Sequence, residues 1–595
     1  MRSDKSGSRT ILWLWVWVAA GAGVTTAIGM GFARFGLHHF VHESPHLVWT
    51  AAVAYAIFTA PLAVAAQIAK RWLGDRADAL ALMTMVAMAG FGVLLNVRRI
   101  HHAALALIAL GVGVQIARLF RRHRQRAMSI VYRSTPIFVG LLVIGAMTVV
   151  GRRTLGERRA LAALPPPDGS LPNVLLLVLD TVRSFSLSAY GFPQPTSPAL
   201  ERLAAEGVLF EQAYSSSSWT LPSHASMMTG TWPRQNGASW TVPLDGRFGT
   251  LAEALSRLGY RTGGFIANTH YTGAGSGVER GFSHYSDWVI SLPMILRSVE
   301  MGRLLLDHER TLRLFRRYAY FDRRLTPSVT RSFLEWKNRD SGRPFFAFLN
   351  VFDAHAAYDP PAPFDSLFGA RDRRLKADLV NDGQWPADEV ARHQRAYEGS
   401  IAYQDSWLAE MFAEMARDGS LDRTIVIVTS DHGEEFFEHD LMGHGLSLYP
   451  ATVRVPLLIR YPPKIGRLRI GDAVSNRTIP STVWDLVGAA GPSPFPGRSL
   501  GGFWDTGGQG GHSIEPVLIT IDHAPNLPHA YPVSDGPLIS VVESGFQYIV
   551  DSKGRRELYP IASDPARRPN LAADSSYRPV LERLVFLADS MTKEP

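Results

Sequence analysis

The chain has 595 residues, of which 46% are apolar and 19% are charged, and its formal net charge is +8. This length exceeds one ordinary hydrophobic core, so we expect two or more structural units. The sequence contains no cysteine, which excludes disulfides, thiolate metal sites and a cysteine nucleophile. The positive charge would suit nucleic-acid binding, but the arginines of residues 118–133 lie between apolar segments. Membrane topology explains them better, and we expect no nucleic-acid partner.

Apolar segments dominate residues 1–151 and predict a transmembrane region of about five helices. They are residues 11–33, 47–69, 79–97, 103–117 and 136–151. The first three reach the length of roughly 20 residues that a bilayer core requires, whereas the last two are shorter, so four spans are the alternative. The first segment lacks a cleavage site and is followed by further apolar segments. We therefore expect a retained helix and not a signal peptide.

Basic residues between these segments predict their orientation. Arg9, Lys70, Arg71 and the arginine-rich residues 118–133 all fall on one side of the predicted membrane region. By the positive-inside rule this side is cytoplasmic, and an odd number of spans places everything after Gly151 outside. The sequence therefore predicts a multi-pass protein of the cytoplasmic membrane with an extracytoplasmic C-terminal part.

After the last span, residues 152–172 contain a run of three prolines and are predicted to form a linker. Three apolar runs of strand length follow, separated by segments with helical periodicity, which predicts an α/β fold with a mostly parallel sheet. The strand candidates are NVLLLVLD, PFFAFLNVFDAH and TIVIVTSDHGEE. Ligands of such sheets bind at the carboxyl ends of the strands, which is where Asp180, His355, Asp431 and His432 fall.

Five longer motifs succeed one another in this part of the chain. They are NVLLLVLDTVR, SPALERLAAEGVLFEQAYSSSSWTLPSHASMMTG, SDHGEEFFEHDLMGHG, RVPLLIRYP and RRELYPIASDPARRPNL. In this order they resemble the sulfatase family of the alkaline phosphatase superfamily. The resemblance implies an alkaline phosphatase-like catalytic domain at 173–515 and a small antiparallel C-terminal subdomain at 516–595. With its membrane region, the layout is also similar to lipoteichoic acid synthases and phosphoethanolamine transferases.

The stretch TLPSH, residues 220–224, stands where sulfatases have Cys or Ser followed by any residue, Pro, Ser and Arg. The first residue of that motif is oxidised to formylglycine, which threonine cannot form, so no formylglycine is expected. By resemblance to the transferase and phosphodiesterase branches, Thr220 is a nucleophile. The alternative is that Thr220 caps a helix beginning near Pro222. Both roles are compatible, because a helix N-terminus also favours an anionic substrate.

A threonine hydroxyl is a weak nucleophile at neutral pH, so it requires a divalent cation to lower its pKa. The resemblance implies that Thr220 shares a metal site with Asp180, Asp431 and His432. An imidazole ligand favours zinc or manganese, with calcium and magnesium as alternatives. For Asp431 and His432 the alternative to metal binding is a loop turn with a surface histidine.

Further polar residues are expected in the same site. His355 and His444 are expected to be catalytic, either as ligands of a second metal or as proton donors to the leaving oxygen. His224 replaces the usual arginine and is also expected to be catalytic. The resemblance places Asn268 and His270 where the family contacts the sulfate with a lysine and a histidine, so both are expected to bind substrate. The loss of these fixed cations favours a singly charged diester over a doubly charged monoester.

The sequence therefore predicts a membrane-anchored metalloenzyme that cleaves or transfers a sulfate or phosphate ester through Thr220. The expected partners are membrane lipids and an anionic ester substrate, such as an envelope lipid or glycan. A threonine nucleophile favours phosphorus over sulfur, whereas the family resemblance favours sulfate. One alternative is a phosphoethanolamine- or phosphoglycerol-type transferase acting on cell-envelope lipids or glycans. Another is a catalytically inactive membrane receptor for anionic glycans or lipids.

Overall fold

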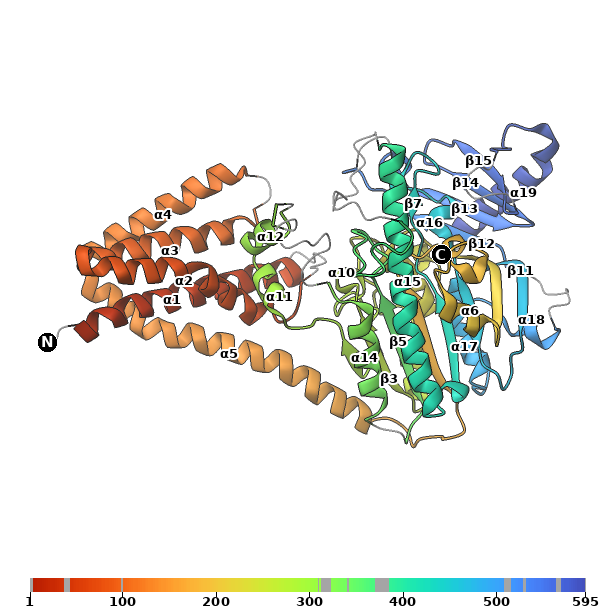
Figure 1. Ribbon diagram of the computed structural model, residues 1–595, viewed down its shortest axis with the longest axis horizontal. Helices are drawn as coiled ribbons and strands as arrows, with labels where there is room; N and C mark the ends of the chain where they lie inside the picture. The colour runs from red at the N-terminus through yellow and green to blue at the C-terminus, as the bar shows by residue number, and fades with distance from the viewer. Residues whose placement is uncertain are drawn as a thin grey trace. The chain divides into compact units, whose positions relative to one another are not determined.

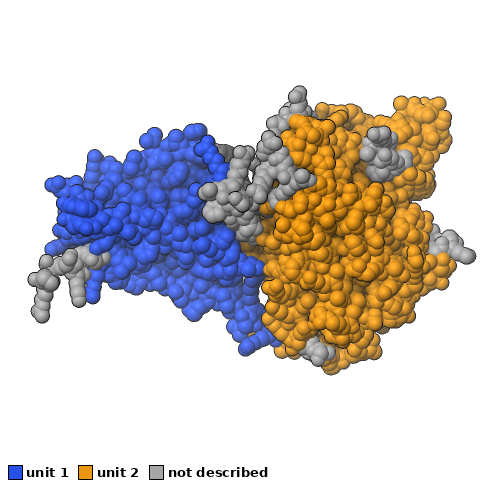
Figure 2. Space-filling model, in the orientation of Figure 1, with its two compact units in different colours: residues 1–158, 289–322 blue, residues 159–288, 323–595 orange. Residues whose placement is uncertain are grey.

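The computed structural model describes the chain in ten stretches. They are residues 4–36, 43–97, 100–308, 310–311, 323–339, 342–369, 385–507, 515–527, 531–562 and 569–593. The chain divides into two compact units, shown in blue and orange in Figure 2. Unit 1 comprises residues 1–158 and 289–322, and unit 2 comprises residues 159–288 and 323–595. Unit 2 is thus interrupted by a segment that belongs to unit 1.

Unit 1 is built around five long apolar helices (Figure 1). They are α1 (Asp4–Gly31), followed by a π-helical turn (Phe32–Gly36), α2 (Leu47–Leu73), α3 (Arg76–Leu94), α4 (His102–Arg122) and α5 (Arg124–Ala162). Each corresponds to one of the five predicted apolar segments, although the predicted segments 11–33 and 79–97 extend two and three residues past the ends of α1 and α3. Each is long and apolar enough to cross a membrane. Helix α5 continues past the predicted span 136–151 to Ala162, so the first part of the predicted linker is helical.

Small residues and one buried ion pair network hold these helices together. A Cβ atom on Gly23 would lie 2.4 Å from the Cβ atom of Ala52, so α1 and α2 can approach this closely only because residue 23 is glycine. The carboxylate of Asp78, buried at the start of α3, lies 2.5 Å from Lys70 and 2.5 Å from Arg124. These two cations compensate the cost of burying that carboxylate.

Residues 289–308 add the short helices α11 (Leu292–Arg297) and α12 (Glu300–Leu306) to unit 1. Val299, which lies between them, is buried in the same hydrophobic core as residues of α1, α2 and α3.

Unit 2 is centred on a nine-stranded sheet with the order β11-β2-β10-β6-β1-β5-β3-β4, and β9 pairs with β2. Strands β6, β1, β5, β3 and β4 run parallel, whereas β10 is antiparallel to both β6 and β2, so the sheet is mixed with a parallel centre. The strands are β1 (Asn173–Leu179), β2 (Val208–Tyr214), β3 (Arg261–Ile266), β4 (His284–Ser286), β5 (Phe345–Val351), β6 (Thr424–Thr429), β9 (Arg454–Val455), β10 (Leu457–Arg460) and β11 (Leu468–Ser475). Strands β1, β5 and β6 are buried along their whole length, which explains their continuous apolar sequences.

Helices cover both faces of this sheet. On one face Leu175 and Leu177 of β1 share a core with side chains of α6 (Pro198–Ala204), α14 (Thr326–Lys337) and α15 (Ala387–Arg417). Phe348 of β5 points to the other face, where its ring lies 5.7 Å from the ring of His224 on α7 (Thr220–Thr229). The other helices of unit 2 are α8 (Pro233–Asn236), α9 (Leu251–Arg257), α10 (Thr269–Thr272), α16 (Pro450–Val453), α17 (Ile479–Leu486) and α18 (Gly501–Asp505).

The C-terminal residues form a separate antiparallel sheet. Its strands are β12 (Val517–Ile521), β13 (Leu538–Glu543), β14 (Phe546–Val550) and β15 (Arg556–Pro560), paired in sequence order. Helix α19 (Arg578–Lys593) packs against it through Leu584 and Ala588, and a two-stranded ladder joins β7 (Glu435–Phe436) to β8 (Met442–Gly443). The predicted fold class, an α/β domain with a small antiparallel sheet at its C-terminus and apolar helices before it, is confirmed.

Candidate active site

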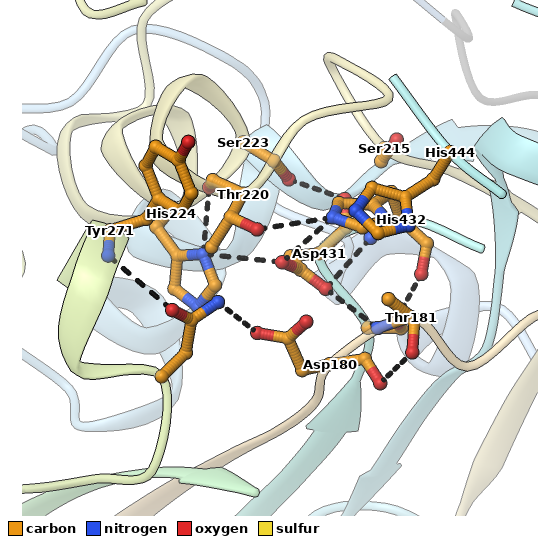
Figure 3. Close-up of polar contacts among 12 residues, drawn as sticks. Asp180, Thr181, Ser215, Thr220, Ser223, His224, Tyr271, Asp431, His432 and His444 are labelled. Carbon is orange, nitrogen blue, oxygen red and sulfur yellow. Dashed lines mark hydrogen bonds and ion pairs between the residues drawn. The ribbon is translucent and has the colours of Figure 1, made fainter. Parts of the chain in front are cut away.

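Polar residues meet where the central parallel strands end. Asp180 follows β1, Asp431 follows β6, and Asn350 is the next-to-last residue of β5 between β1 and β3. Because the carboxyl ends of parallel strands lie at one edge of the sheet, these three side chains converge. Figure 3 shows Asp180 and Asp431 of this cluster together with Thr220 and His432.

Asp180, Asp431 and His432 form a fully buried group that could hold a metal ion. One ligand atom from each of the three lies within 4.8 Å of the others. Asp180 uses Oδ2 to accept hydrogen bonds from Asn268 (3.0 Å) and Asn350 (3.1 Å). Its Oδ1 atom, like Oδ2 of Asp431, is buried and has no hydrogen-bond partner among the described residues. A bound cation would supply the interaction that these two carboxylate oxygens lack.

The electrostatics of the two aspartates also fit a cation. Burial raises the pKa of Asp180 well above its usual range, and the neighbouring Asp431 raises it further. Burial likewise raises the pKa of Asp431, although His224 and two backbone N–H groups oppose this. Two buried carboxylates at this distance repel each other, and a divalent cation would remove that repulsion. Together with a neutral imidazole, this donor set suits zinc or manganese.

His432 is held so that one ring nitrogen faces Thr220. Its Nδ1 lies 3.1 Å from the carbonyl oxygen of Gly433 and donates to it, which leaves Nε2 as the acceptor. Burial lowers the pKa of His432 to about 3, so the ring is neutral. The hydroxyl of Thr220 lies 3.2 Å from Nε2. Thr220 is therefore in direct contact with the candidate metal group.

Thr220 is the first residue of α7, and the preceding Trp219 occupies the N-cap position. The helix thus starts two residues before the predicted start at Pro222. Proline is tolerated there because the N–H groups of the first turn have no acceptor within the helix. The side chain of Thr220 is 2% exposed and turns towards His432, and no side-chain cap is formed at this helix end.

His224 and Asn268, two further predicted site residues, are bound within the protein. His224 is fully buried one turn after Thr220, and its Nδ1 lies 2.8 Å from the carbonyl oxygen of Thr220 and 3.6 Å from Asp431. Asn268 donates to Asp180 and caps α10, so its amide orients a candidate metal ligand. His270 is exposed on α10, with its ring 6.4 Å from the ring of Trp288.

His444 and His355 complete the cluster from the side of the β7–β8 ladder. The ring of His444 stacks on His432 at 4.4 Å and lies 4.9 Å from the ring of His355. Burial opposes protonation of His444, but the carboxylate of Glu434, 2.8 Å from Nδ1, outweighs it and raises the pKa. Burial, with His444 and Arg323 nearby, lowers the pKa of His355 well below its usual value. His444 is therefore suited to carry a proton, whereas His355 is suited to remain neutral.

Sequence reasoning missed three residues that support this cluster. Glu434 orients His444, Asn350 orients Asp180, and Thr181 donates its backbone N–H to Asp431 at 3.2 Å. Thr181 does so with a φ of 62°, which is unusual for a β-branched residue. Asn350 carried a signal, since it is a polar residue within a buried apolar strand, and Glu434 carried a weaker one, since it lies in the polar segment five residues after β6. The role of the Thr181 backbone had no signal in the sequence.

A cavity of about 400 Å³ adjoins the start of α7. Trp219, Pro222 and Trp240 line it together with Arg234 and Asp522. The ring of Trp219 also lies 5.5 Å from the rings of His444 and Tyr271, so the same indole contacts both the histidine cluster and the cavity. A group bound in this cavity would lie beside the residue that precedes Thr220.

Known proteins resemble a large part of this chain. The sulfatase family model matches residues 172–489. Arylsulfatase K of Bos taurus is 26% identical over 413 residues, which cover 61% of this chain and 71% of that protein. An arylsulfatase of Clostridium perfringens is 23% identical over 480 residues, covering 71% and 94%. The crystal structure of the phosphonate monoester hydrolase of Agrobacterium radiobacter matches with a TM-score of 0.56 at 21% identity, covering 71% and 95%, which shows a shared fold.

Proposed function

Because the chain belongs to the sulfatase family of sulfuric and phosphoric ester hydrolases, we propose that it cleaves such an ester through Thr220 at the outer surface of the cytoplasmic membrane. The observation that carries this proposal is the contact between the Thr220 hydroxyl and His432, 3.2 Å apart, within the Asp180, Asp431 and His432 group. A hydroxyl at a helix N-terminus beside three candidate ligands has the surroundings of an activated nucleophile.

Asp180, Asp431 and His432, with Thr220 as a fourth ligand, would hold a divalent cation. Such an ion supplies positive charge that lowers the pKa of a neighbouring hydroxyl and neutralises the oxygens of the ester. The carboxylates stay in place because Asn268 and Asn350 hold Asp180, and Thr181 holds Asp431.

The reaction then runs through a covalent threonine ester. Thr220 reacts as its alkoxide, having lost its hydroxyl proton to solvent before the cycle begins. Its Oγ1 attacks sulfur or phosphorus, the bond to the leaving alcohol breaks, and His444 gives its proton to the departing oxygen. Glu434 binds Nδ1 of His444, so the opposite ring nitrogen is the one that donates. In the second half a water molecule attacks the threonine ester and returns a proton to His444. Sulfate or phosphate is released, and Thr220 ends the cycle in the protonation state in which it began.

Membrane anchoring is proposed on the five apolar helices and on their basic connections. Helices α1 to α5 are each long and apolar enough to cross a bilayer. The basic residues around Lys70, Arg71 and 118–133 favour a cytoplasmic location for that end of the helices, which leaves unit 2 outside. An anionic envelope lipid or glycan would be the substrate accessible there. The cavity beside Trp219 supports an ester whose organic part is large enough to fill a pocket.

The test uses the full chain purified in detergent, treated with chelator and reloaded with zinc, manganese, calcium or magnesium. Hydrolysis of 4-nitrophenyl sulfate, 4-nitrophenyl phosphate and bis(4-nitrophenyl) phosphate should disappear with the metal and return with at least one of the ions. Asp431→Asn should lose bound metal and activity together, because it removes a charged ligand. Activity that survives chelation, or an Asp431→Asn enzyme that keeps its full metal content and rate, would refute the proposed site.

A further inference from the structure

Residues 289–306 leave unit 2 after β4 and form a pair of short helices in unit 1, here called the α11–α12 hairpin. Ser291 caps α11 through its hydroxyl, and Pro293 occupies the first turn, so the chain turns sharply into this helix. The two helices touch at Gly302, where a Cβ atom would lie 1.8 Å from the carbonyl oxygen of Leu296. The hairpin is therefore a defined structure whose close contact requires glycine.

The inner side of the hairpin belongs to the helical core of unit 1. Val299 is 1% exposed and packs, with the partly buried Ile295, into the core that contains residues of α1, α2 and α3. Arg303 of α12 pairs with Glu43, just before α2, at 2.6 Å. The hairpin is thus attached to the helices of unit 1 by apolar packing and by an ion pair, although β4 and α14, its neighbours along the chain, belong to unit 2.

The outer side of the hairpin is apolar and exposed. Five large apolar side chains within seventeen residues are half exposed: Val289 (52%), Ile290 (48%), Leu292 (59%), Leu304 (46%) and Leu305 (53%). In the described part of unit 2, by contrast, the large apolar residues with this degree of exposure are three scattered ones, Val242, Leu367 and Phe586. Clustered exposure of this kind marks an interaction surface, whereas scattered exposure does not.

The surroundings of the hairpin indicate which partner covers it. Figure 1 places α11 and α12 at the end of the helical bundle away from the N-terminus, which is also the end that carries Glu43. The bundle itself exposes many large apolar residues, such as Leu107 and Leu141, so the hairpin and the helices on which it packs share this exposure of apolar side chains. The basic connection between α4 and α5 lies at the opposite end, which the charge rule assigns to the cytoplasm.

We propose that the α11–α12 hairpin lies in the outer interface of the bilayer, with Val289, Ile290, Leu292, Leu304 and Leu305 in contact with lipid. Its short helices carry apolar residues on the outer side, while its charged residues are paired, Arg303 with Glu43 and Arg297 with Asp307. This is the distribution of an element that rests in the headgroup and upper acyl region without crossing the membrane. The proposal rests on the membrane anchoring proposed above and adds to it a second membrane contact, supplied from within the catalytic part of the sequence.

The absence of cysteine from the sequence allows a direct test with single labelled sites. The full chain is prepared as Leu305→Cys, Leu141→Cys and Phe586→Cys, each labelled with the fluorophore NBD and placed in phosphatidylcholine nanodiscs with or without doxyl-labelled lipid. The three positions are comparably exposed, at 53%, 51% and 68%, and lie in the hairpin, in α5 and in α19. NBD at Leu305 should be quenched, more strongly by a doxyl group near the headgroup than by one deep in the acyl chain. NBD at Leu141 should show the reverse order, and NBD at Phe586 should be quenched by neither.

Three results would overturn the proposal, and they can be distinguished from one another. If Leu141 is quenched but Leu305 behaves like Phe586, the helices are in the membrane and the hairpin is not. A blue-shifted but unquenched probe at Leu305 would likewise overturn it, by showing that protein and not lipid covers this surface. If Leu141 itself is not quenched, the membrane anchoring is refuted and the hairpin assignment with it.

Discussion

Two conservative substitutions of Thr220 separate its role in catalysis from its contribution to the stability of the fold. Thr220→Ser deletes one methyl group from a side chain that is 2% exposed, and Thr220→Val replaces the hydroxyl with a methyl group of similar size. The lost methyl should cost about 1 kcal/mol in the free energy of unfolding, counting transfer and a small cavity. The lost hydroxyl removes the hydrogen bond to His432, which is also worth about 1 kcal/mol.

The two variants should therefore be destabilised by similar amounts and differ chiefly in the hydroxyl. If Thr220 is the nucleophile, Thr220→Ser keeps measurable turnover, while Thr220→Val loses it by a factor that reaches on the order of 10⁶ for nucleophile removal in other hydrolases. The assay is the hydrolysis rate per folded, metal-loaded molecule, with thermal unfolding measured in the same detergent. Mass spectrometry of enzyme quenched during turnover should find a sulfuryl- or phosphoryl-sized adduct on the peptide that contains Thr220.

The opposite pattern would refute the mechanism. A residue that matters only for the start of α7 would leave the rate of Thr220→Val at the parental value, with a loss of stability as the sole effect. An unmodified Thr220 peptide under conditions where substrate is turning over fast would also count against a covalent intermediate.

Three further predictions concern topology, substrate binding and pH. A periplasmic reporter fused after Asp168 should be active, and a cytoplasmic reporter at the same position should be inactive; the reverse would contradict the orientation. Trp240→Ala should raise KM for a glycosyl or lipid ester that fills the cavity and leave KM for 4-nitrophenyl sulfate nearly unchanged; equal effects on both would exclude the cavity as a substrate pocket. Burial raises the pKa of Asp405 from 3.8 to about 6, so its protonated form is favoured in the folded protein and stability falls as pH rises from about 4 to about 6. The parent should lose about 3 kcal/mol in its free energy of unfolding over this pH range. Asp405→Asn does not titrate, so its stability relative to the parent should increase from about pH 4 to about pH 6. A difference in thermal unfolding that stays constant with pH would contradict the raised pKa of Asp405.

Strand ends were the part of the site most accessible from sequence. Asp180 and Asp431 could be located because they lie one and two residues after the fully buried apolar strands β1 and β6, and parallel strands bring such positions together. The side-chain partners were less accessible, since they depend on loop conformation. Asn268 donates to Asp180 from the loop after β3, and the pairing of Glu434 with His444 depends on the β7–β8 ladder.

The α11–α12 hairpin was not expected from the sequence for a different reason. Its helices span Leu292–Arg297 and Glu300–Leu306, which is too short for a reliable 3.6-residue period. Its apolar residues also lie far along the chain from the five predicted membrane segments. The packing of Val299 and Ile295 and the pairing of Arg303 with Glu43 connect the hairpin to residues 1–158.

The interruption of unit 2 by residues 289–322 has a consequence for proteolysis. A protease that cuts the proline-containing stretch after Ala162 severs the connection through α5, but the C-terminal fragment still carries the hairpin. Contacts of Val299 and Arg303 with the N-terminal helices would keep the two fragments together without a covalent bond. Release of unit 2 would therefore require two further cuts, one on each side of residues 289–322. By the same reasoning, the two pieces co-expressed as separate polypeptides should assemble, which makes this protein a natural candidate for a split reporter at the membrane.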